Sequence, residues 1–340
     1  MYDTDVVIIG GGPAGTASAI TCLEKGLRVI IVESEKFPRH QFGETLPPGI
    51  EPLLKKLGVL PQIQNANFLR HKGNWVKWDK SLHFKPFGSD ENGPWLGFQA
   101  WRANFDAILL DKAVSLGAEI YQPCRAIRPI IENYRIKGVI TSLGKISSPF
   151  LIDATGRRQW LTQKLKLQID KYSPRLIAKF GYVHGECPVR DEAPAIIADN
   201  TGWTWTAKVR PHIYQWTRLS FSGESLEKNW IPKEFHGLEP VGPMSGADMT
   251  WRIVKQCGGR GYFLTGDAAA ILDPSSSHGV LKAVMSGMLA GHLIAQVIND
   301  NYQEQHAIQG YCKWVMDWFK QDVKKLHELY ACLPGTSRLS

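Results

Sequence analysis

The feature that most constrains the fold is a glycine-rich turn close to the N-terminus, GGGPAG. The apolar stretch DVVIIG runs into this turn and suits a buried parallel strand, and TASAITCLEKG follows it as a helix of small and apolar residues. Gly10, Gly12 and Gly15 have the G-x-G-x-x-G spacing. The first glycine allows a tight turn, the second lets the backbone approach a pyrophosphate, and the third lets the helix pack on the strand.

A second apolar stretch, RVIIVE, follows the helix and ends in Glu33, eighteen residues after Gly15. A carboxylate at the end of this second strand can accept hydrogen bonds from both ribose hydroxyls of a dinucleotide. The glycine spacing alone is weak evidence, because a helix-capping glycine loop of an unrelated α/β protein has the same letters. Strand, glycines, helix, strand and acid in this order predict a dinucleotide-binding domain.

Length and composition narrow the class of protein. The chain has 340 residues, 44% hydrophobic and 21% charged, which suits about two globular domains. No apolar run approaches the roughly 20 residues that a membrane helix needs, and the N-terminus lacks the features of a signal peptide. The net charge of +8 is spread without a long basic block. This charge pattern favours an anionic cofactor or a protein partner over nucleic acid, so neither nucleic acid nor a membrane is an expected partner.

The cysteines are scattered, with no CxxC pair and no His-Cys cluster. This spacing argues against zinc and against a disulfide framework, so no metal is expected and a reducing, cytoplasmic location is predicted. The oligomeric state stays open. The six cysteines are Cys22, Cys124, Cys187, Cys257, Cys312 and Cys332.

A third segment, GDAAAILDPSSSHGVLKAVMSG, favours FAD over NAD as the dinucleotide. Asp267 follows an apolar strand and can accept a hydrogen bond from a ribityl hydroxyl, which FAD has and NAD lacks. Pro274 interrupts the backbone, and a helix that starts near Val280 then points its positive end at the isoalloxazine ring, which favours an anionic reduced flavin. A solvent loop with a capping serine is the plainer interpretation of the same letters.

These motifs together resemble the aromatic-hydroxylase superfamily of flavoproteins, and within it the tryptophan-halogenase and geranylgeranyl-reductase branch. The resemblance rests on GGGPAG, DATGR and GDAAAILDPSSSHG, and on the segments KFPRHQFGETLPPG and WRANFDAILLDKAVSLGAEIY. It implies an FAD whose adenosine half, pyrophosphate–ribityl region and flavin ring are held in this order along the chain. The implied FAD-binding residues are Gly10, Gly12, Pro13, Ala14, Gly15, Glu33, Arg39, Arg102, Asp267, Pro274 and Gly279.

Alternating strands between the FAD segments predict an antiparallel sheet, which in the resembled family covers the flavin and carries the substrate pocket. Trp203 and Trp205 are two residues apart, so in a strand they share one face, and we expect Trp216 on the next strand to join that face. Such an aromatic wall suits an aromatic substrate, although a cluster of tryptophans is also ordinary core.

The predicted architecture is therefore α/β, with a Rossmann-like FAD domain of the glutathione-reductase type, an inserted antiparallel-sheet substrate domain and a helical C-terminal segment. The expected bounds are 1–70, 96–165 and 258–300 for the FAD domain, 71–95 and 166–257 for the sheet domain, and 301–334 for the helices.

The chemistry is less tightly specified than the cofactor. Halogenases carry W-x-W-x-I-P where this chain has W-T-W-T-A-K. They also use a lysine on a strand to direct hypohalous acid onto the substrate. Lys72 stands in a comparable position, and the plainer interpretation is a solvated strand lysine. His278 stands where halogenases have Ser or Thr beside the halide. As candidates for the group that assists oxygen transfer, Lys72 and His278 are suggested by position only.

A closer resemblance is to short flavoproteins that mature cysteine tryptophylquinone oxidases. It implies that O2 and reduced FAD form a C4a-hydroperoxide that hydroxylates a tryptophan side chain of a partner protein, a quinoprotein oxidase precursor. Electrons would come from NAD(P)H or from a separate reductase. The alternatives are a flavin-dependent halogenase of an aromatic small molecule, a geranylgeranyl-reductase-like oxidoreductase, and a flavin-binding assembly factor without catalysis.

Overall fold

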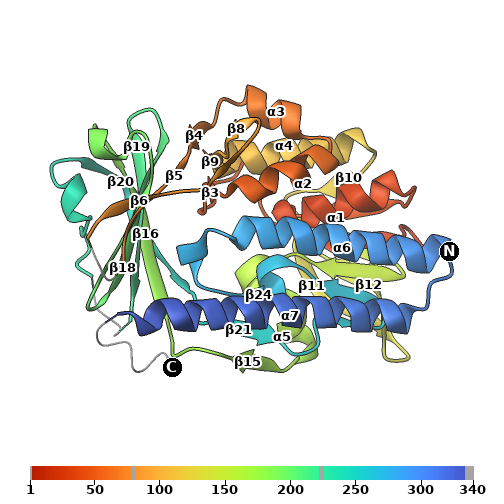
Figure 1. Ribbon diagram of the computed structural model, residues 1–340. Coiled ribbons are helices and arrows are strands. Elements are labelled where there is room, and N and C mark those ends of the chain that lie inside the picture. Colours follow the sequence, from red (N-terminus) through yellow and green to blue (C-terminus); the bar gives the residue numbers. More distant parts are fainter. Residues whose placement is uncertain (1, 79–80, 222–225, 334–340) are drawn as a thin grey trace.

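The computed structural model describes residues 2–78, 81–221 and 226–333 and has two main sheets (Figure 1). The first sheet has six strands in the order β10-β2-β1-β14-β23-β22, parallel except for the last pair. Its strands are β1 (Val6–Ile9), β2 (Val29–Val32), β10 (Glu119–Tyr121), β14 (Phe150–Asp153), β22 (Gly258–Gly259) and β23 (Tyr262–Leu264). The short, fully buried strands β1 and β2 flank α1 (Pro13–Glu24), as the glycine motif predicts.

The second main sheet has seven strands in the order β20-β16-β19-β18-β17-β5-β6. All its pairs are antiparallel except that between β17 and β5, which confirms the predicted antiparallel sheet. In Figure 1 it stands at one end of the molecule, across from the six-stranded sheet. Its strands are β5 (Gly73–Lys77), β6 (His83–Pro86), β16 (Ile177–His184), β17 (Ala195–Asp199), β18 (Gly202–Arg210), β19 (Ile213–Ser220) and β20 (Glu239–Asp248).

Smaller sheets and further helices complete the fold. The short sheets are β3 (Thr45–Leu46) with β9 (Gly97–Gln99) and β4 (Leu69–His71), β7 (Ser89–Asp90) with β8 (Gly93–Pro94), β11 (Ala126–Glu132) with β12 (Arg135–Thr141) and β13 (Gly144–Ser147), and β15 (Ile169–Lys171) with β21 (Arg252–Val254) and β24 (Ala270–Ile271). The remaining helices are α2 (Glu51–Lys56), α3 (Leu60–Asn65), α4 (Arg102–Ser115), α5 (Trp160–Leu165), α6 (Gly279–Asn299) and α7 (Glu304–Ala331).

Glycines allow α1 and α6 to pack at close range. A Cβ added to Gly287 would lie 2.2 Å from the carbonyl oxygen of Ala14, and one added to Gly291 would lie 2.9 Å from that of Ser18. Side chains at these positions would push the helices apart. The start of α6 is therefore held beside the glycine turn.

α6 corrects the expectation that no apolar run approaches the length of a membrane helix. It has 21 residues and a mean hydropathy of 1.4, so by length and composition alone it is long and apolar enough to cross a membrane. Lys282 and His292 are the only charged or titratable side chains in the helix, so its sequence is nearly all apolar and small. The face with Gly287 and Gly291 packs against α1, which accounts for this composition without a membrane.

The C-terminal segment forms a single helix, α7, where the sequence left one or two open. It runs alongside α6 and reaches the seven-stranded sheet at its C-terminal end (Figure 1). There the indole N–H of Trp78 donates to the carbonyl of Leu329 over 2.7 Å. Residues buried along one face of α7 are Ala307, Ile308, Tyr311, Val315, Phe319, Val323, Leu326 and Tyr330.

The contact between α1 and α6 predicts opposite effects for two glycine substitutions. Gly287→Ala should lower the free energy of unfolding by about 1–3 kcal/mol, because the methyl group meets the backbone of Ala14. Gly310→Ala, in the exposed part of α7 with no atom within 4 Å, should raise it by roughly 0.4–1 kcal/mol. Urea unfolding of the two variants measures both, and equal effects would contradict the close packing.

Candidate functional site

A cavity of about 880 Å³ lies between the two main sheets. The carboxyl ends of β1, β2, β14 and β23 open into it, and the tryptophans of β18 close it on the other side. In open α/β sheets this edge is where nucleotides bind. The cavity is long enough to run from Glu33 at one end to Trp203 and His278 at the other, so an extended dinucleotide is the kind of ligand that it suits.

Because the turn is made of glycines, backbone atoms form the floor of the cavity there. Gly10 has a φ of +106°, and a Cβ there would lie 2.5 Å from the carbonyl oxygen of Ala154. A Cβ on Gly15 would lie 1.9 Å from the carbonyl oxygen of Gly10, so Gly15 packs α1 on the turn and is not part of the cavity lining. Gly12, the N-cap of α1, makes no side-chain cap and lines the cavity together with Pro13 and Ala14. These residues fit the pyrophosphate of FAD.

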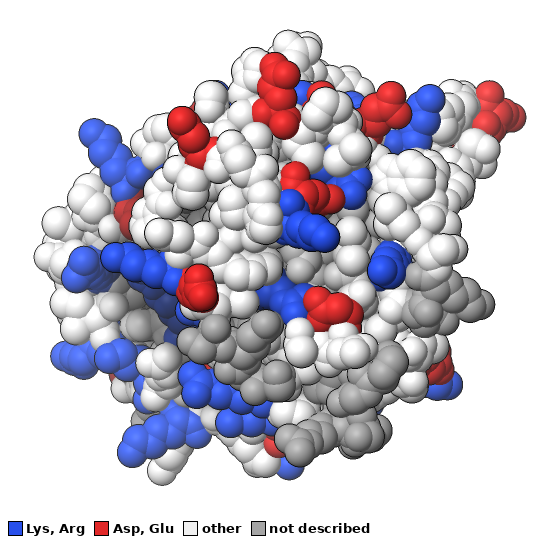
Figure 2. All heavy atoms as spheres, turned by 90° about the vertical axis from the view of Figure 1, so that its left-hand side faces the viewer, with Lys and Arg blue, Asp and Glu red and all other residues white. Residues whose placement is uncertain are grey.

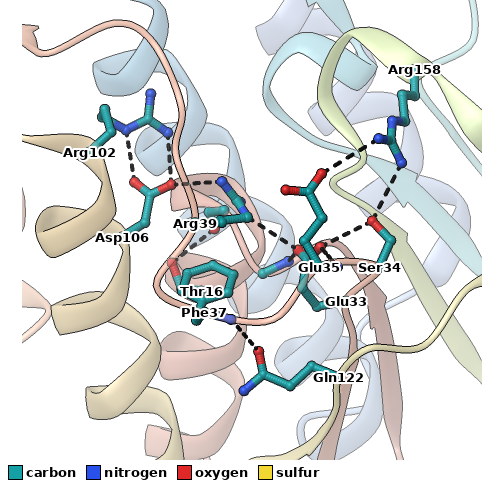
Figure 3. Close-up of polar contacts among 12 residues, drawn as sticks. Thr16, Glu33, Ser34, Glu35, Phe37, Arg39, Arg102, Asp106, Gln122 and Arg158 are labelled. Carbon is teal, nitrogen blue, oxygen red and sulfur yellow. Dashed lines mark hydrogen bonds and ion pairs between the residues drawn. The ribbon is translucent and has the colours of Figure 1, made fainter. Parts of the chain in front are cut away.

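Glu33 has the geometry expected of a ribose ligand. One carboxylate oxygen accepts a hydrogen bond from the backbone N–H of Gly11 at 2.8 Å, and the other accepts from the N–H of Glu35 at 2.9 Å (Figure 3). The hydroxyl of Ser34 donates to the second oxygen over 3.2 Å. The carboxylate is thus fixed at the edge of the cavity, next to the turn, with its position set by backbone donors.

Two arginines share one buried carboxylate above the turn. Arg102, at the first position of α4, donates from Nε and Nη2 to the two oxygens of Asp106 at 2.8 and 3.0 Å, and Nη1 of Arg39 lies 3.3 Å from Asp106 (Figure 3). Burial opposes charge at Arg102, but the carboxylate of Asp106 outweighs it and raises the pKa of the guanidinium. Both arginines line the cavity, where their guanidinium groups can donate to a pyrophosphate, and Nε of Arg39 also lies 3.9 Å from a carboxylate oxygen of Glu33.

Asp267 lies where the sequence predicts, just after β23. The preceding Gly266 has a φ of +58°, and a Cβ there would lie 3.3 Å from the Cβ of Ala14, so this turn lies beside the start of α1. Burial raises the pKa of the Asp267 carboxyl, and Arg157, Arg102 and Arg252 oppose the rise. A carboxyl group there can bond to a ribityl hydroxyl.

The loop after β24 leads into α6 at the far end of the cavity. Asp273 accepts the N–H of Ser275 at 2.9 Å, and Pro274, His278 and Gly279 line the cavity. α6 begins at Gly279, one residue from the predicted start, with His278 as an N-cap that makes no side-chain cap. Burial lowers the pKa of the half-buried His278, and the carboxylate of Asp322 opposes this shift.

The inner face of the seven-stranded sheet forms the wall opposite this loop. Trp203 and Trp205 line the cavity, with Gln215 and Thr217 of β19 beside them. The prediction that Trp216 shares this face is wrong. Trp205 pairs with Thr217 and Thr206 pairs with Trp216, and because side chains alternate along a strand, Trp216 lies on the opposite face. There it packs with Tyr214, Phe235 and Trp230.

A hydrogen-bonded chain that the sequence did not indicate fixes Trp203. Its indole N–H donates to the hydroxyl of Tyr330 over 2.7 Å, and this hydroxyl donates to Asp273 over 2.6 Å. The three residues are distant in the sequence, and only the end of α7 brings them together. Burial and the neighbouring Asp273 raise the pKa of Tyr330, so the phenol keeps its proton.

Lys72 lies between β4 and β5 with an exposed side chain, outside the cavity lining. Its proposed role in directing the oxidant stays a prediction. Among the described lysines, Lys282 is the one that lines the cavity. Its ammonium lies 3.3 Å from Asp322 and 4.5 Å from the centre of the Trp318 ring.

Comparison with known proteins agrees with an FAD site in this cavity. Residues 5–159 match the family model described as FAD dependent oxidoreductase. A flavin-dependent halogenase of Armillaria mellea is 27% identical, over 89% of this chain and 69% of its own length. The brominase of 1H-pyrrole-2-carbonyl on a peptidyl-carrier protein from Pseudoalteromonas luteoviolacea is 29% identical, over 87% of this chain and 78% of its own.

The fold is that of a solved halogenase. The structure of the myxobacterial chondrochloren halogenase aligns with a TM-score of 0.88, covering 98% of this chain and 84% of that one at 22% identity. The predicted α/β fold with an added antiparallel sheet and C-terminal helices is therefore confirmed.

The contacts of Glu33 predict its share in FAD binding. Glu33→Ala should weaken FAD binding about 10- to 100-fold, because a charged hydrogen-bond acceptor for the ribose is lost. Titration of the apoprotein with FAD, followed by flavin fluorescence, measures the Kd. Glu24→Ala, at the end of α1 and outside the cavity lining, is the matched control and should leave Kd unchanged. An unchanged Kd in Glu33→Ala would contradict the assignment.

The buried His71 predicts a pH effect on stability. Its Nδ1 lies 3.1 Å from the carbonyl of Gly73, and burial lowers its pKa to about 4. The unfolded imidazole gains its proton near pH 6.5 while the folded one stays neutral, so the free energy of unfolding falls as pH drops from about 6.5 to 4, by up to about 3 kcal/mol. His71→Gln should flatten this part of the stability curve. Parallel curves for both proteins would refute a neutral, buried His71.

Proposed function

Since the chain is an FAD-dependent oxidoreductase of the flavin-dependent halogenase and aromatic hydroxylase superfamily, we propose that it halogenates a small aromatic molecule. The observation that carries the proposal is the tryptophan wall. Trp203 and Trp205 face the loop before α6 across one continuous cavity, in a chain whose similarity to halogenases extends over nearly its whole length.

The residues that hold the cofactor form one series along the cavity. Glu33 would hold the ribose, the turn with Arg39 and Arg102 the pyrophosphate, Asp267 the ribityl chain, and the loop at Pro274 the ring. Reduced FAD bound there would supply oxidising power through its reaction with O2, with electrons from NAD(P)H or a separate reductase.

The chain's own residues then control charge and water at the ring. α6 starts at Gly279 without a side-chain cap, so its first N–H groups are available to a halide ion. The imidazole of His278, whose pKa is lowered by burial, can take up a proton at a ring nitrogen beside the same place. Trp203, held through its indole N–H by Tyr330, keeps water from this end of the cavity.

A second candidate function is hydroxylation of a tryptophan side chain in a partner protein, such as a quinoprotein oxidase precursor. The W-T-W-T-A-K segment lacks the Ile-Pro of halogenases, and His278 replaces their hydroxyl residue. Figure 2 shows the end of the molecule that carries the seven-stranded sheet, where basic side chains gather on the lower left of the view. Lys77 and Arg210 are exposed on this sheet, and such a surface suits an acidic partner.

A product assay separates the two functions. FAD-loaded protein with a flavin reductase, NADH and O2 should convert an indole or pyrrole carboxylic acid to a product in which bromine replaces hydrogen, detected by mass spectrometry. Omission of bromide and chloride should abolish the product. A hydroxylated product that forms without halide, or an added oxygen on a co-expressed quinoprotein precursor, would contradict halogenation and favour the second candidate.

Trp205 should affect coupling between oxygen use and product. Trp205→Ala opens the wall of the cavity to water, so we expect several-fold less product per NADH consumed and more hydrogen peroxide. Peroxide and product are measured in the same reaction. Trp216→Phe, on the outer face of the sheet, is the matched control and should keep the coupling of the natural protein. An unchanged ratio in Trp205→Ala would show that this side chain does not protect the reaction.

A further inference from the structure

Two thiols outside the large cavity are direct neighbours. Cys257 precedes β22 of the six-stranded sheet and is buried, and Cys312 lies on α7 and is half-buried. The thiol of Cys257 donates a hydrogen bond to the sulfur of Cys312. We infer that these two cysteines form a redox site, which hydrogen peroxide oxidises to a disulfide and a dithiol reduces again. The site is separate from the residues of the proposed halogenation and does not depend on it.

The backbone around the two sulfurs holds them together. Sγ of Cys312 lies 3.8 Å from the carbonyl oxygen of Gly258, the residue after Cys257, and a Cβ added to Gly258 would lie 3.5 Å from the same sulfur. One residue earlier in α7, the hydroxyl of Tyr311 donates to the carbonyl oxygen of Leu264 over 2.6 Å. The N–H of Leu264 donates in turn to the carbonyl oxygen of Cys257 over 2.8 Å. A disulfide would therefore join two segments that are already fixed against each other.

The two thiols differ in reactivity. The hydrogen bond from Cys257 lowers the pKa of Cys312, although burial opposes this, and the same bond together with burial raises the pKa of Cys257. Cys312 also has the more exposed side chain. A thiolate is the form of cysteine that attacks a peroxide, so Cys312 is the residue that reacts first.

The oxidation takes place in two balanced steps. The thiolate of Cys312 takes one oxygen from hydrogen peroxide and becomes a sulfenic acid, and the hydroxide that leaves forms water with the proton that the thiol gave up. The sulfur of Cys257 then attacks the sulfenic sulfur, whose hydroxyl leaves as a second water with the proton of Cys257. Two thiols are oxidised to one disulfide, and one hydrogen peroxide is reduced to two waters.

The disulfide would secure the C-terminal helix on the six-stranded sheet. The link between Cys257 and Cys312 closes a loop of roughly 55 residues, so it restricts the unfolded chain strongly. The same helix carries Tyr330, whose hydroxyl binds the indole N–H of Trp203 at the large cavity. Oxidation therefore stabilises the helix that holds the tryptophan wall in place.

Peptide mapping of the unaltered, FAD-loaded protein tests the inference. The protein is reduced with dithiothreitol, desalted, treated with hydrogen peroxide, alkylated with N-ethylmaleimide and digested without reductant. We expect a linked pair of peptides that contain Cys257 and Cys312, absent from the sample without peroxide and lost after renewed treatment with dithiothreitol. Alkylation of both residues after peroxide, or a sulfinic acid at Cys312 without a link, would overturn the inference.

Three cysteine variants assign the roles. Cys257→Ser should let the sulfenic acid of Cys312 accumulate, and we expect about tenfold more labelling by dimedone than in the natural protein. Cys312→Ser should leave Cys257 unoxidised, because a buried thiol with a raised pKa reacts slowly. Cys332→Ser, at the exposed cysteine after α7, is the matched control and should keep the link. Equal dimedone labelling in Cys257→Ser and the natural protein would contradict the attack by Cys257.

Urea unfolding measures the effect of the link on the fold. Peroxide should raise the urea midpoint of the natural protein by roughly 1 M, and it should leave the midpoint of Cys257→Ser unchanged. No shift in the natural protein, or an equal shift in both proteins, would contradict a link that secures α7. None of these measurements uses the halogenation assay, so failure of the proposed function would leave their outcome unchanged.

Discussion

The helix α1 begins in direct contact with the turn that leads into it, and the rest of the structure depends on this contact. Gly15 faces the carbonyl of Gly10 at a distance that no side chain permits. Close packing continues from there, because Gly287 of α6 meets the carbonyl of Ala14 in the same turn of α1. One glycine turn thus fixes both the floor of the large cavity and the direction in which α6 enters it.

The charged side chains along the cavity also hold one another in place. Asp106 bonds to both Arg102 and Arg39 and so orients two cations, and Arg39 also lies 3.9 Å from Glu33. At the other end, His278 and the uncapped start of α6 offer donors without a fixed full charge. Guanidinium groups therefore lie where a pyrophosphate would bind, while His278 and the ion pair of Lys282 with Asp322 lie where a ring would react.

The sequence predicts best what depends on local geometry. Gly10, Gly12 and Glu33 follow from a strand–turn–helix–strand unit, and Asp267 follows from a strand that ends in the same sheet. The face of Trp216 depends on the register between two strands, which alternation in one strand does not determine. Tyr330 reaches Asp273 and Trp203 only because α7 ends against the second sheet. Asp106 had a readable signal, since it stands four residues after Arg102 in a helix.

The chemical residues were harder to predict than the cofactor residues for a physical reason. Pyrophosphate binding uses backbone groups whose positions a short motif determines. A lysine or tryptophan near a reacting atom depends instead on which cavity it faces. Lys72 stands where the resemblance to halogenases places a lysine, but its side chain is exposed. Lys282 lies in an apolar helix and lines the cavity. Composition likewise did not indicate that α6 is long and apolar enough to cross a membrane, or that its glycine face packs against α1.

We propose that one FAD lies along the large cavity, with its ring between the loop at Pro274 and the wall of Trp203 and Trp205. A crystal structure of the protein soaked with FAD measures this directly. We expect electron density that runs from Glu33 past Arg102 to His278. Density for the flavin ring outside this cavity, or no density in crystals whose protein binds FAD in solution, would contradict it.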